Sequence, residues 1–247
     1  MTSPDTTPAS RRFALPLDPR GILLRAARMG RVLVGVRAPG ALLERIGPFD
    51  PVVERGDGWL VSENASGRTA IDPAAVASIV TDVSETPHDT LLTYVDFLDA
   101  DGASIVKVTA LDGPELLEAA LDGLPRDPLP YVPPLPRTTI PVDQNDPGAL
   151  PFRAAVASGE AVTLVAVRPG AEQSHTGTVE AVRLGHSYVN LIQSDMHLHL
   201  SAGAVGAWRR NGEGARVTLA AEDAEGRPIG LAVSGPASAF AEAGVPA

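Results

Sequence analysis

The chain of 247 residues is long enough for one large domain or for two modules of about 100–150 residues each. Its formal net charge of −10 disfavours binding to nucleic acids or anionic membranes, because both carry negative charge. The absence of cysteine excludes disulfides, thiolate metal sites and cysteine nucleophiles, which leaves histidine as the strongest nitrogen ligand for a transition metal. No apolar stretch has the length of a secretion signal or a transmembrane helix, so we expect a soluble cytoplasmic protein.

The first half is predicted to begin with a disordered tail over residues 1–17, followed by a module over 18–124. A helix is expected to begin at Asp18-Pro19, because Asp is a common N-cap and Pro fits the first helical position. It is expected to stop at Gly30. Short strands and one more helix complete this module. The strands are predicted over 31–37, 59–62, 90–98 and 104–109, with a hairpin turn at 99–102, and the second helix over 114–121.

A proline-rich segment divides the chain nearly in half. Nine prolines lie between residues 125 and 151, and proline at that density excludes a helix or a central strand. We therefore expect an extended linker over 125–150 and a second module over 151–247.

The second half repeats the first, with offsets that drift by only a few residues. The sequence therefore predicts an α+β fold made of two repeated modules, each with a large antiparallel sheet and short helices. Two such units would pack their sheets and leave a cleft at their junction, where side chains from both halves converge. The clearest matches join residues 38–41 to 168–171, 45–48 to 175–178, and 99–102 to 223–226.

The histidines are concentrated in the second half, where four of the five lie between residues 175 and 199. On a strand, His197 and His199 would point to one face of the sheet. His175 lies just before Thr176-Gly177, where a strand would turn, so its ring would project into a cleft. Three interpretations stay open: structural histidines, a zinc or other metal site for which no carboxylate has supporting spacing, and a single histidine ligand to haem iron.

Several segments resemble motifs of the HemS/ChuX family of haem-utilisation proteins, which are themselves built as two repeats. Residues 172–179 (EQSHTGTV) are similar to that family's Gln-x-His-Ser/Thr-Gly-Pro-Val motif. Residues 188–191 (YVNL) and 197–200 (HLHL) resemble its Trp-x-Asn-Val-Leu and Asn-Leu-His-Leu-Arg run. The resemblance covers about residues 18–235 and continues in the first half at 30–32, 44–47 and 97–102.

The resemblance implies two HemS-like modules that bind haem b in the cytoplasm, for haem trafficking or storage after uptake. It implies that His175 is the iron ligand and that Arg68 serves the distal side of the haem. His199 and Arg209 are further candidates for contacts with the haem. Haem is thus the expected partner, with a haem-uptake transporter or a haem oxygenase as its donor or acceptor. Neither nucleic-acid binding nor membrane insertion is expected.

Two alternatives remain beside haem trafficking. One is a haem-degrading, oxygenase-like enzyme that releases iron, because both roles occur in the family that the sequence resembles. The other is a scaffold or interaction module that keeps the fold without haem. Residues 70–77 favour the scaffold, because alanines stand there where the family has an aromatic strand.

Overall fold

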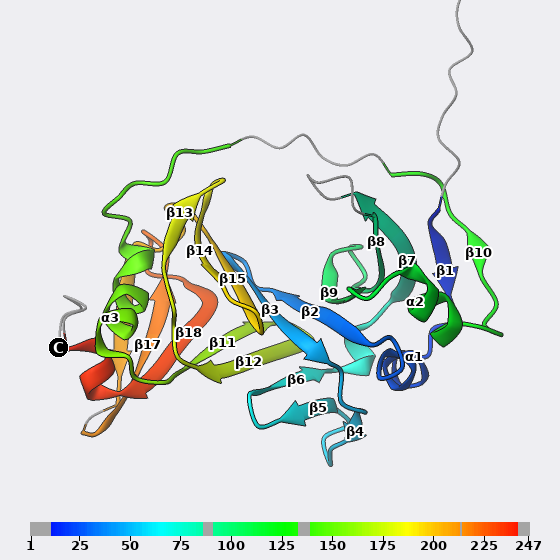
Figure 1. Ribbon diagram of the computed structural model, residues 1–247, viewed down its shortest axis with the longest axis horizontal. Helices are drawn as coiled ribbons and strands as arrows, with labels where there is room; N and C mark the ends of the chain where they lie inside the picture. The colour runs from blue at the N-terminus through cyan, green and yellow to red at the C-terminus, as the bar shows by residue number, and fades with distance from the viewer. Residues whose placement is uncertain (1–10, 86–90, 133–138, 213, 242–247) are drawn as a thin grey trace, which may run out of the picture.

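The computed structural model describes residues 11–85, 91–132, 139–212 and 214–241. Within these ranges the strands form two antiparallel sheets, and three short α-helices pack beside them (Figure 1). The ten-stranded sheet has the order β10 (Asp127–Pro128), β1 (Phe13–Leu15), β7 (Ser78–Glu85), β8 (Leu91–Leu98), β9 (Ser104–Ala110), β2 (Arg31–Arg37), β3 (Ala41–Pro48), β15 (Met196–Ser201), β14 (Tyr188–Ile192) and β13 (Arg183–Gly185). The eight-stranded sheet has the order β16 (Ala207–Asn211), β17 (Arg216–Glu222), β18 (Pro228–Pro236), β11 (Val162–Arg168), β12 (Ala171–Gly177), β6 (Gly67–Ile71), β5 (Leu60–Asn64) and β4 (Val53–Glu54).

The helices are short, and the first begins where the sequence predicts. The α-helices are α1 (Pro19–Ala26), α2 (Pro114–Ala120) and α3 (Leu150–Ser158), and the 3₁₀ turns are η1 (Pro73–Ala75), η2 (Pro147–Ala149) and η3 (Ala237–Phe240). Asp18 caps α1 by accepting a hydrogen bond of 2.9 Å from the backbone N–H of Gly21. The capped helix buries Ile22 and Leu23, which anchors it to the core.

The predicted disordered tail over 1–17 is wrong at its C-terminal end. Phe13–Leu15 forms β1, which pairs with β7 on one side and with β10 on the other. Leu15 is buried, so burial of an apolar side chain and two ladders of hydrogen bonds order this segment. β10 lies inside the predicted linker and includes Pro128, which is tolerated there because β10 is an edge strand.

Each sheet contains strands from both halves of the sequence. β3 of the first half pairs with β15 of the second, and β12 of the second half pairs with β6 of the first. The two halves thus exchange three strands each: β4–β6 extend the sheet of the second half, and β13–β15 extend the sheet of the first. The predicted module bounds of 18–124 and 151–247 therefore divide the sequence and do not coincide with the sheets.

The internal repeat is visible in register and in turn geometry. Arg45 lies opposite Val34 in the β2–β3 hairpin, and His175 lies opposite Leu164 in the equivalent β11–β12 hairpin. The hairpins β8–β9 and β17–β18 carry matching turns, in which an aspartate side chain accepts two backbone N–H groups. The glycine of each turn has a similar positive φ, 76° in one and 77° in the other.

The two sheets meet where β2 and β3 pack on β11 and β12. Gln173 on β12 is fully buried at this contact, and its amide Nε2 donates hydrogen bonds to the backbone carbonyls of Val34 and Leu43 at 2.9 and 2.6 Å. Its Oε1 accepts a hydrogen bond of 2.8 Å from Thr69. One side chain therefore joins β12 to three other strands and links both sheets. The face of β12 that carries Gln173 is the inner face.

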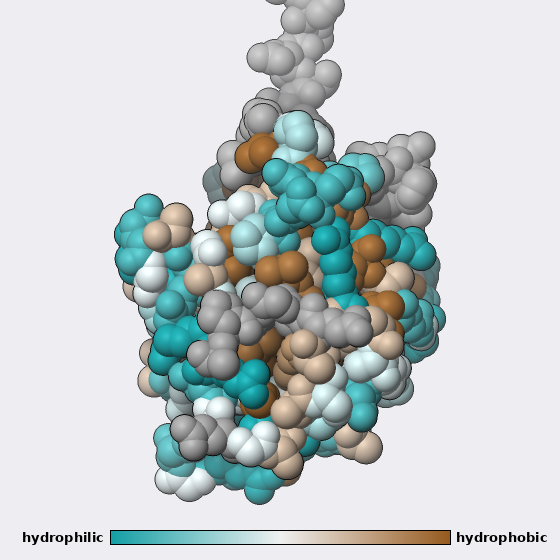
Figure 2. Space-filling model, turned by 90° about the vertical axis from the view of Figure 1, so that its left-hand side faces the viewer, coloured by the Kyte–Doolittle hydropathy of each residue, from teal (hydrophilic) through white to brown (hydrophobic). Residues whose placement is uncertain are grey.

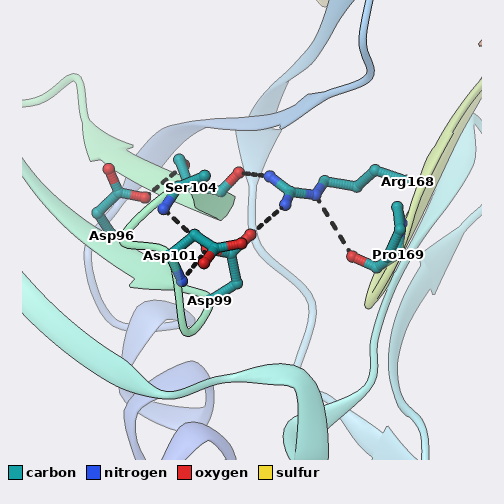
Figure 3. Close-up of polar contacts among 7 residues, drawn as sticks. Asp96, Asp99, Asp101, Ser104, Arg168 and Pro169 are labelled. Carbon is teal, nitrogen blue, oxygen red and sulfur yellow. Dashed lines mark hydrogen bonds and ion pairs between the residues drawn. The ribbon is translucent and has the colours of Figure 1, made fainter.

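Arg168, at the end of β11, ties the second half to the β8–β9 hairpin of the first (Figure 3). Its guanidinium contacts the carboxylate of Asp99 at 2.6 Å and donates a hydrogen bond to the backbone carbonyl of Ser104. The pKa of Asp99 is lowered, first by the backbone N–H of Ala103 and then by Arg168. The contact couples the turn of one half to the central strand of the other.

At the end of the molecule turned to the viewer in Figure 2, brown hydrophobic areas are interrupted by teal hydrophilic side chains. Among the residues that the structure describes, no helix is long and apolar enough to cross a membrane.

Candidate functional site

Two neighbouring residues of β3 point to opposite sides of the ten-stranded sheet. Arg45 points to the inner side, where its guanidinium contacts the Thr69 hydroxyl at 3.3 Å and the Asn64 amide oxygen at 2.9 Å. Glu44 points to the outer side, where its carboxylate lies beside His197 and His199. Because side chains alternate along a strand, β3 contributes to two separate sites.

The inner site is formed by His175, Arg45 and Asp195. His175 follows Gln173 by two residues on β12, so its ring lies on the same inner face. The residue is only 2% exposed, and neither ring nitrogen has a hydrogen-bond partner. Its Nε2 lies 3.6 Å from the carboxylate of Asp195, which is too far for a hydrogen bond.

The charge state of His175 follows from this environment. Burial lowers the pKa of His175, because the charged imidazolium loses its hydration. The Asp195 carboxylate opposes this effect, whereas the Arg45 guanidinium adds to it. Near neutral pH the ring is therefore an uncharged imidazole with a lone pair available to a ligand.

A cavity of about 140 Å³ adjoins the inner site. Arg45 and Asp195 line it, together with Val32, Val34, Ile46, Gly47, Pro48, Phe49, Ser62, Asn64 and Ser66. The lining mixes apolar residues of β2 and β3 with polar residues around the β5–β6 turn. It is therefore a cavity at the exchange of strands between the halves.

The outer cluster is formed by Glu44, His197 and His199. His197 Nδ1 and His199 Nε2 lie 3.5 and 3.4 Å from the same carboxylate oxygen, Oε2 of Glu44. Burial alone would raise the pKa of Glu44, but the two histidines lower it to about 2. The sequence prediction that His197 and His199 share one face of a strand is confirmed.

The structure does not bring the other predicted site residues to His175. Arg68 lies beside Ser174 on the face of β6 opposite to that of Thr69, and its guanidinium pairs with Glu172 at 2.7 Å. The expectation that Arg68 shares a cleft with His175 is therefore wrong, because one residue of register turns a side chain to the other face.

His199 and Arg209 also lie away from the inner site. His199 belongs to the outer cluster, and Arg209 lies on β16 at the edge of the eight-stranded sheet, paired with Glu222 at 2.6 Å. His175 itself lies on strand β12 and not in a loop. The expectation that its ring projects into a cleft is wrong, because the ring is buried and does not line the cavity beside Arg45 and Asp195.

Arg45, Asp195 and Glu44 are site residues that sequence reasoning did not select. For Arg45 a signal existed, because the repeat aligns it with His175. Glu44 reaches His197 and His199 only through the pairing of β3 with β15, and Asp195 reaches His175 only through the packing of the two sheets.

Solved structures with a similar architecture give an independent comparison. The heme degrading enzyme ChuS of Escherichia coli O157:H7 superimposes with a TM-score of 0.73 at 18% identity, covering 91% of this chain and 81% of ChuS. Holo-PhuS, a heme-binding protein from Pseudomonas aeruginosa, gives a TM-score of 0.72 at 17% identity with the same coverages. The chain has the ChuS and PhuS fold. The α+β fold of two repeated HemS-like modules is thereby confirmed, whereas no family model and no curated protein matches the sequence.

Proposed function

We propose that this protein binds haem at the inner site and that the imidazole of His175 ligates the iron. The observation that carries the proposal is a buried histidine with two unpartnered nitrogens at the junction of the two halves. A buried polar group without a partner costs about 1–3 kcal/mol. A ligand that takes up this lone pair would recover that cost.

The donor set suits haem iron. A single neutral imidazole is a common proximal ligand of haem, and the lowered pKa of His175 keeps its ring neutral. Arg45 supplies a cation from the other half of the chain, and an arginine binds carboxylates through charge-assisted hydrogen bonds. The similar folds of ChuS and PhuS, which are described as heme proteins, add support from outside the chain.

The cavity beside the inner site is smaller than a haem-sized ligand needs. Sites for drug-sized ligands have volumes of roughly 300–1,000 Å³, and the cavity beside Arg45 and Asp195 has about 140 Å³. Haem therefore requires that the gap between β3 and the β5–β6 turn widen when it binds. Asp195 is exposed and lies next to Nε2 of His175, so its side chain is the first that must move.

Haem trafficking or storage in the cytoplasm is the role we propose, with haem b as the ligand and a haem-uptake transporter or a haem oxygenase as donor or acceptor. Arg45, whose charge acts on the His175 ring, takes the place of Arg68 as the proposed cation of the site. Haem breakdown is the second candidate, because the similar fold of ChuS belongs to a protein described as heme degrading.

A hemin titration of the purified chain tests the proposal. We expect a shifted Soret band that saturates at one haem per chain, and we expect His175→Ala to weaken binding by at least about 10-fold through loss of the iron ligand. The matched control is His186→Asn, which replaces an exposed histidine at a positive φ of 53°. Circular dichroism verifies that both variants fold.

Chemical rescue separates ligation from folding. In His175→Gly, added imidazole is expected to restore the wild-type spectrum, because the free ring replaces the missing ligand. Equal spectra of wild type, His175→Ala and His186→Asn with hemin would overturn the ligand assignment. A wild-type spectrum identical to that of free hemin would leave the scaffold interpretation. Bleaching of the bound haem with release of iron, under reductant and oxygen, would assign the protein to haem breakdown.

A further inference from the structure

The outer cluster lies on the face of the ten-stranded sheet that the inner site does not use. Glu44 comes from the first half of the chain, and His197 and His199 come from the second. One ligand atom from each residue lies within 4.8 Å of the other two. No carboxylate lies at a supporting spacing from the histidines in the sequence. The pairing of β3 with β15 places Glu44 beside them.

The hydrogen bonds of Asn190 fix the tautomer of His199. The amide Nδ2 of Asn190 donates to the backbone carbonyls of Gly185 and Tyr188, both at 3.0 Å. Its Oδ1 therefore points toward His199 and accepts from Nδ1 of that ring at 2.7 Å. In the neutral ring Nδ1 then carries the proton, and Nε2 presents a lone pair.

Two acceptors consequently face each other at the centre of the cluster. Nε2 of His199 presents its lone pair to Oε2 of Glu44 at 3.4 Å, and Nδ1 of His197 lies 3.5 Å from the same oxygen. Two lone pairs directed at each other repel unless a proton or a metal ion lies between them. The site is thus built for a cation.

We propose that Glu44, His197 and His199 bind a divalent transition-metal ion of the zinc type. Two imidazole nitrogens and one carboxylate oxygen are a known ligand set for zinc with an open fourth position. With zinc–ligand distances of about 2.0–2.1 Å, tetrahedral ligands lie roughly 3.3–3.5 Å apart. The two measured separations in the cluster agree with that spacing.

Accessibility and electrostatics support the same conclusion. The side chains of His197 and His199 are each 25% exposed, so an ion and a water molecule can reach them from solvent. The formal charge of −10 attracts cations to the protein. Asn190 orients His199 from behind, which is the arrangement that outer-shell partners give to metal-bound histidines.

The test uses the full chain, without haem and after treatment with a chelator. Calorimetric titration with Zn²⁺ is expected to give one ion per chain, and Co²⁺ is expected to give the intense visible absorption of a tetrahedral site. Glu44→Gln keeps the shape of the side chain but removes its charge, and we expect it to weaken Zn²⁺ binding by more than about 10-fold. His197→Ala is expected to weaken it by a similar or larger factor.

Two histidine variants outside the outer cluster serve as controls. His186→Asn removes a histidine outside the cluster, and His175→Ala removes the inner histidine, and both are expected to bind Zn²⁺ as the wild type does. Equal affinities of wild type and Glu44→Gln would overturn the metal site, because the cation between the acceptors would then be a proton. A loss of Zn²⁺ binding in His175→Ala would also overturn it, by placing the ion at the inner site.

Discussion

The histidines on the inner and outer sides of β3 differ in burial and in their partners. On the inner side, His175 is buried without a hydrogen-bond partner and faces Arg45 across the junction of the sheets. On the outer side, His197 and His199 are partly exposed and converge on one carboxylate. The inner site depends on how two sheets pack, whereas the outer cluster depends on strand pairing within one sheet. The alternation of side chains along a single strand thus contributes to two separate clusters of polar residues.

The largest effect is expected from removing the hydrogen bonds that hold the sheets together. Gln173→Leu loses three hydrogen bonds at a fully buried position, two of them to backbone carbonyls of the other sheet. At about 1 kcal/mol for each hydrogen bond, we expect a loss of about 3 kcal/mol in the free energy of unfolding, measured with urea. Ser174→Ala, on the other face of β12, is the control. Equal midpoints for both variants would contradict the role given to Gln173.

A substitution at Gly67 on β6 tests whether the inner site and the outer cluster are independent. A Cβ at Gly67 would lie 2.1 Å from the backbone oxygen of Ser174, where β6 meets β12. Gly67→Ala is therefore expected to cost about 1–3 kcal/mol of unfolding free energy and to weaken haem binding, with Zn²⁺ binding unchanged. Gly185→Ala meets nothing within 4 Å and serves as the control. Weaker Zn²⁺ binding in Gly67→Ala would show that the two sites are not independent.

Asp195 is expected to act against haem at the inner site. Its carboxylate lies 3.6 Å from Nε2 of His175 and lines the cavity. Because Asp195 is exposed, we expect Asp195→Ala to tighten hemin binding by at most about fivefold, equivalent to about 1 kcal/mol. Asp101→Ala removes an exposed carboxylate that does not line the cavity and is the control. A clear loss of affinity in Asp195→Ala would assign that carboxylate a supporting role.

The smallest effect concerns Tyr94 on β8 and appears only at high pH. Burial, and then Asp82 and Asp96, raise the pKa of Tyr94 to about 12. The unfolded chain loses this proton near pH 10, so stability is complete below pH 10 and falls as the pH rises toward 12. Tyr94 is partly exposed, and solvent screening limits the loss to about 1 kcal/mol. Ultraviolet titration is expected to show one late tyrosine that Tyr94→Phe removes, and a single transition near pH 10 would contradict this.

The sequence predicts individual elements well because their signals are local. The Asp18 cap, the strand over 31–37 and the turn at 99–102 are all present, since each depends on residues close together in the chain. The repeat is also detectable, because equivalent hairpins keep the same turn residues.

The exchange of strands could not be predicted from the same signals. A repeat has the same sequence pattern whether β6 pairs with its own half or with the other. The sequence therefore contains no sign that Arg68 and His175 lie on different faces of one sheet. Register then decides which side of the sheet each residue faces, and Arg45 lies on the side of His175, close enough to lower the pKa of its ring, whereas Arg68 does not. Glu44 could be joined to His197 only through the β3–β15 pairing.

The most direct test of the central claim is a nuclear magnetic resonance spectrum of ¹⁵N-labelled histidine rings with and without haem. We predict that the ring signals of His175 shift or broaden strongly when paramagnetic ferric haem binds, while those of His197 and His199 change little. The pattern is expected to reverse with Zn²⁺ alone. Unchanged His175 signals in a protein saturated with haem would contradict the account.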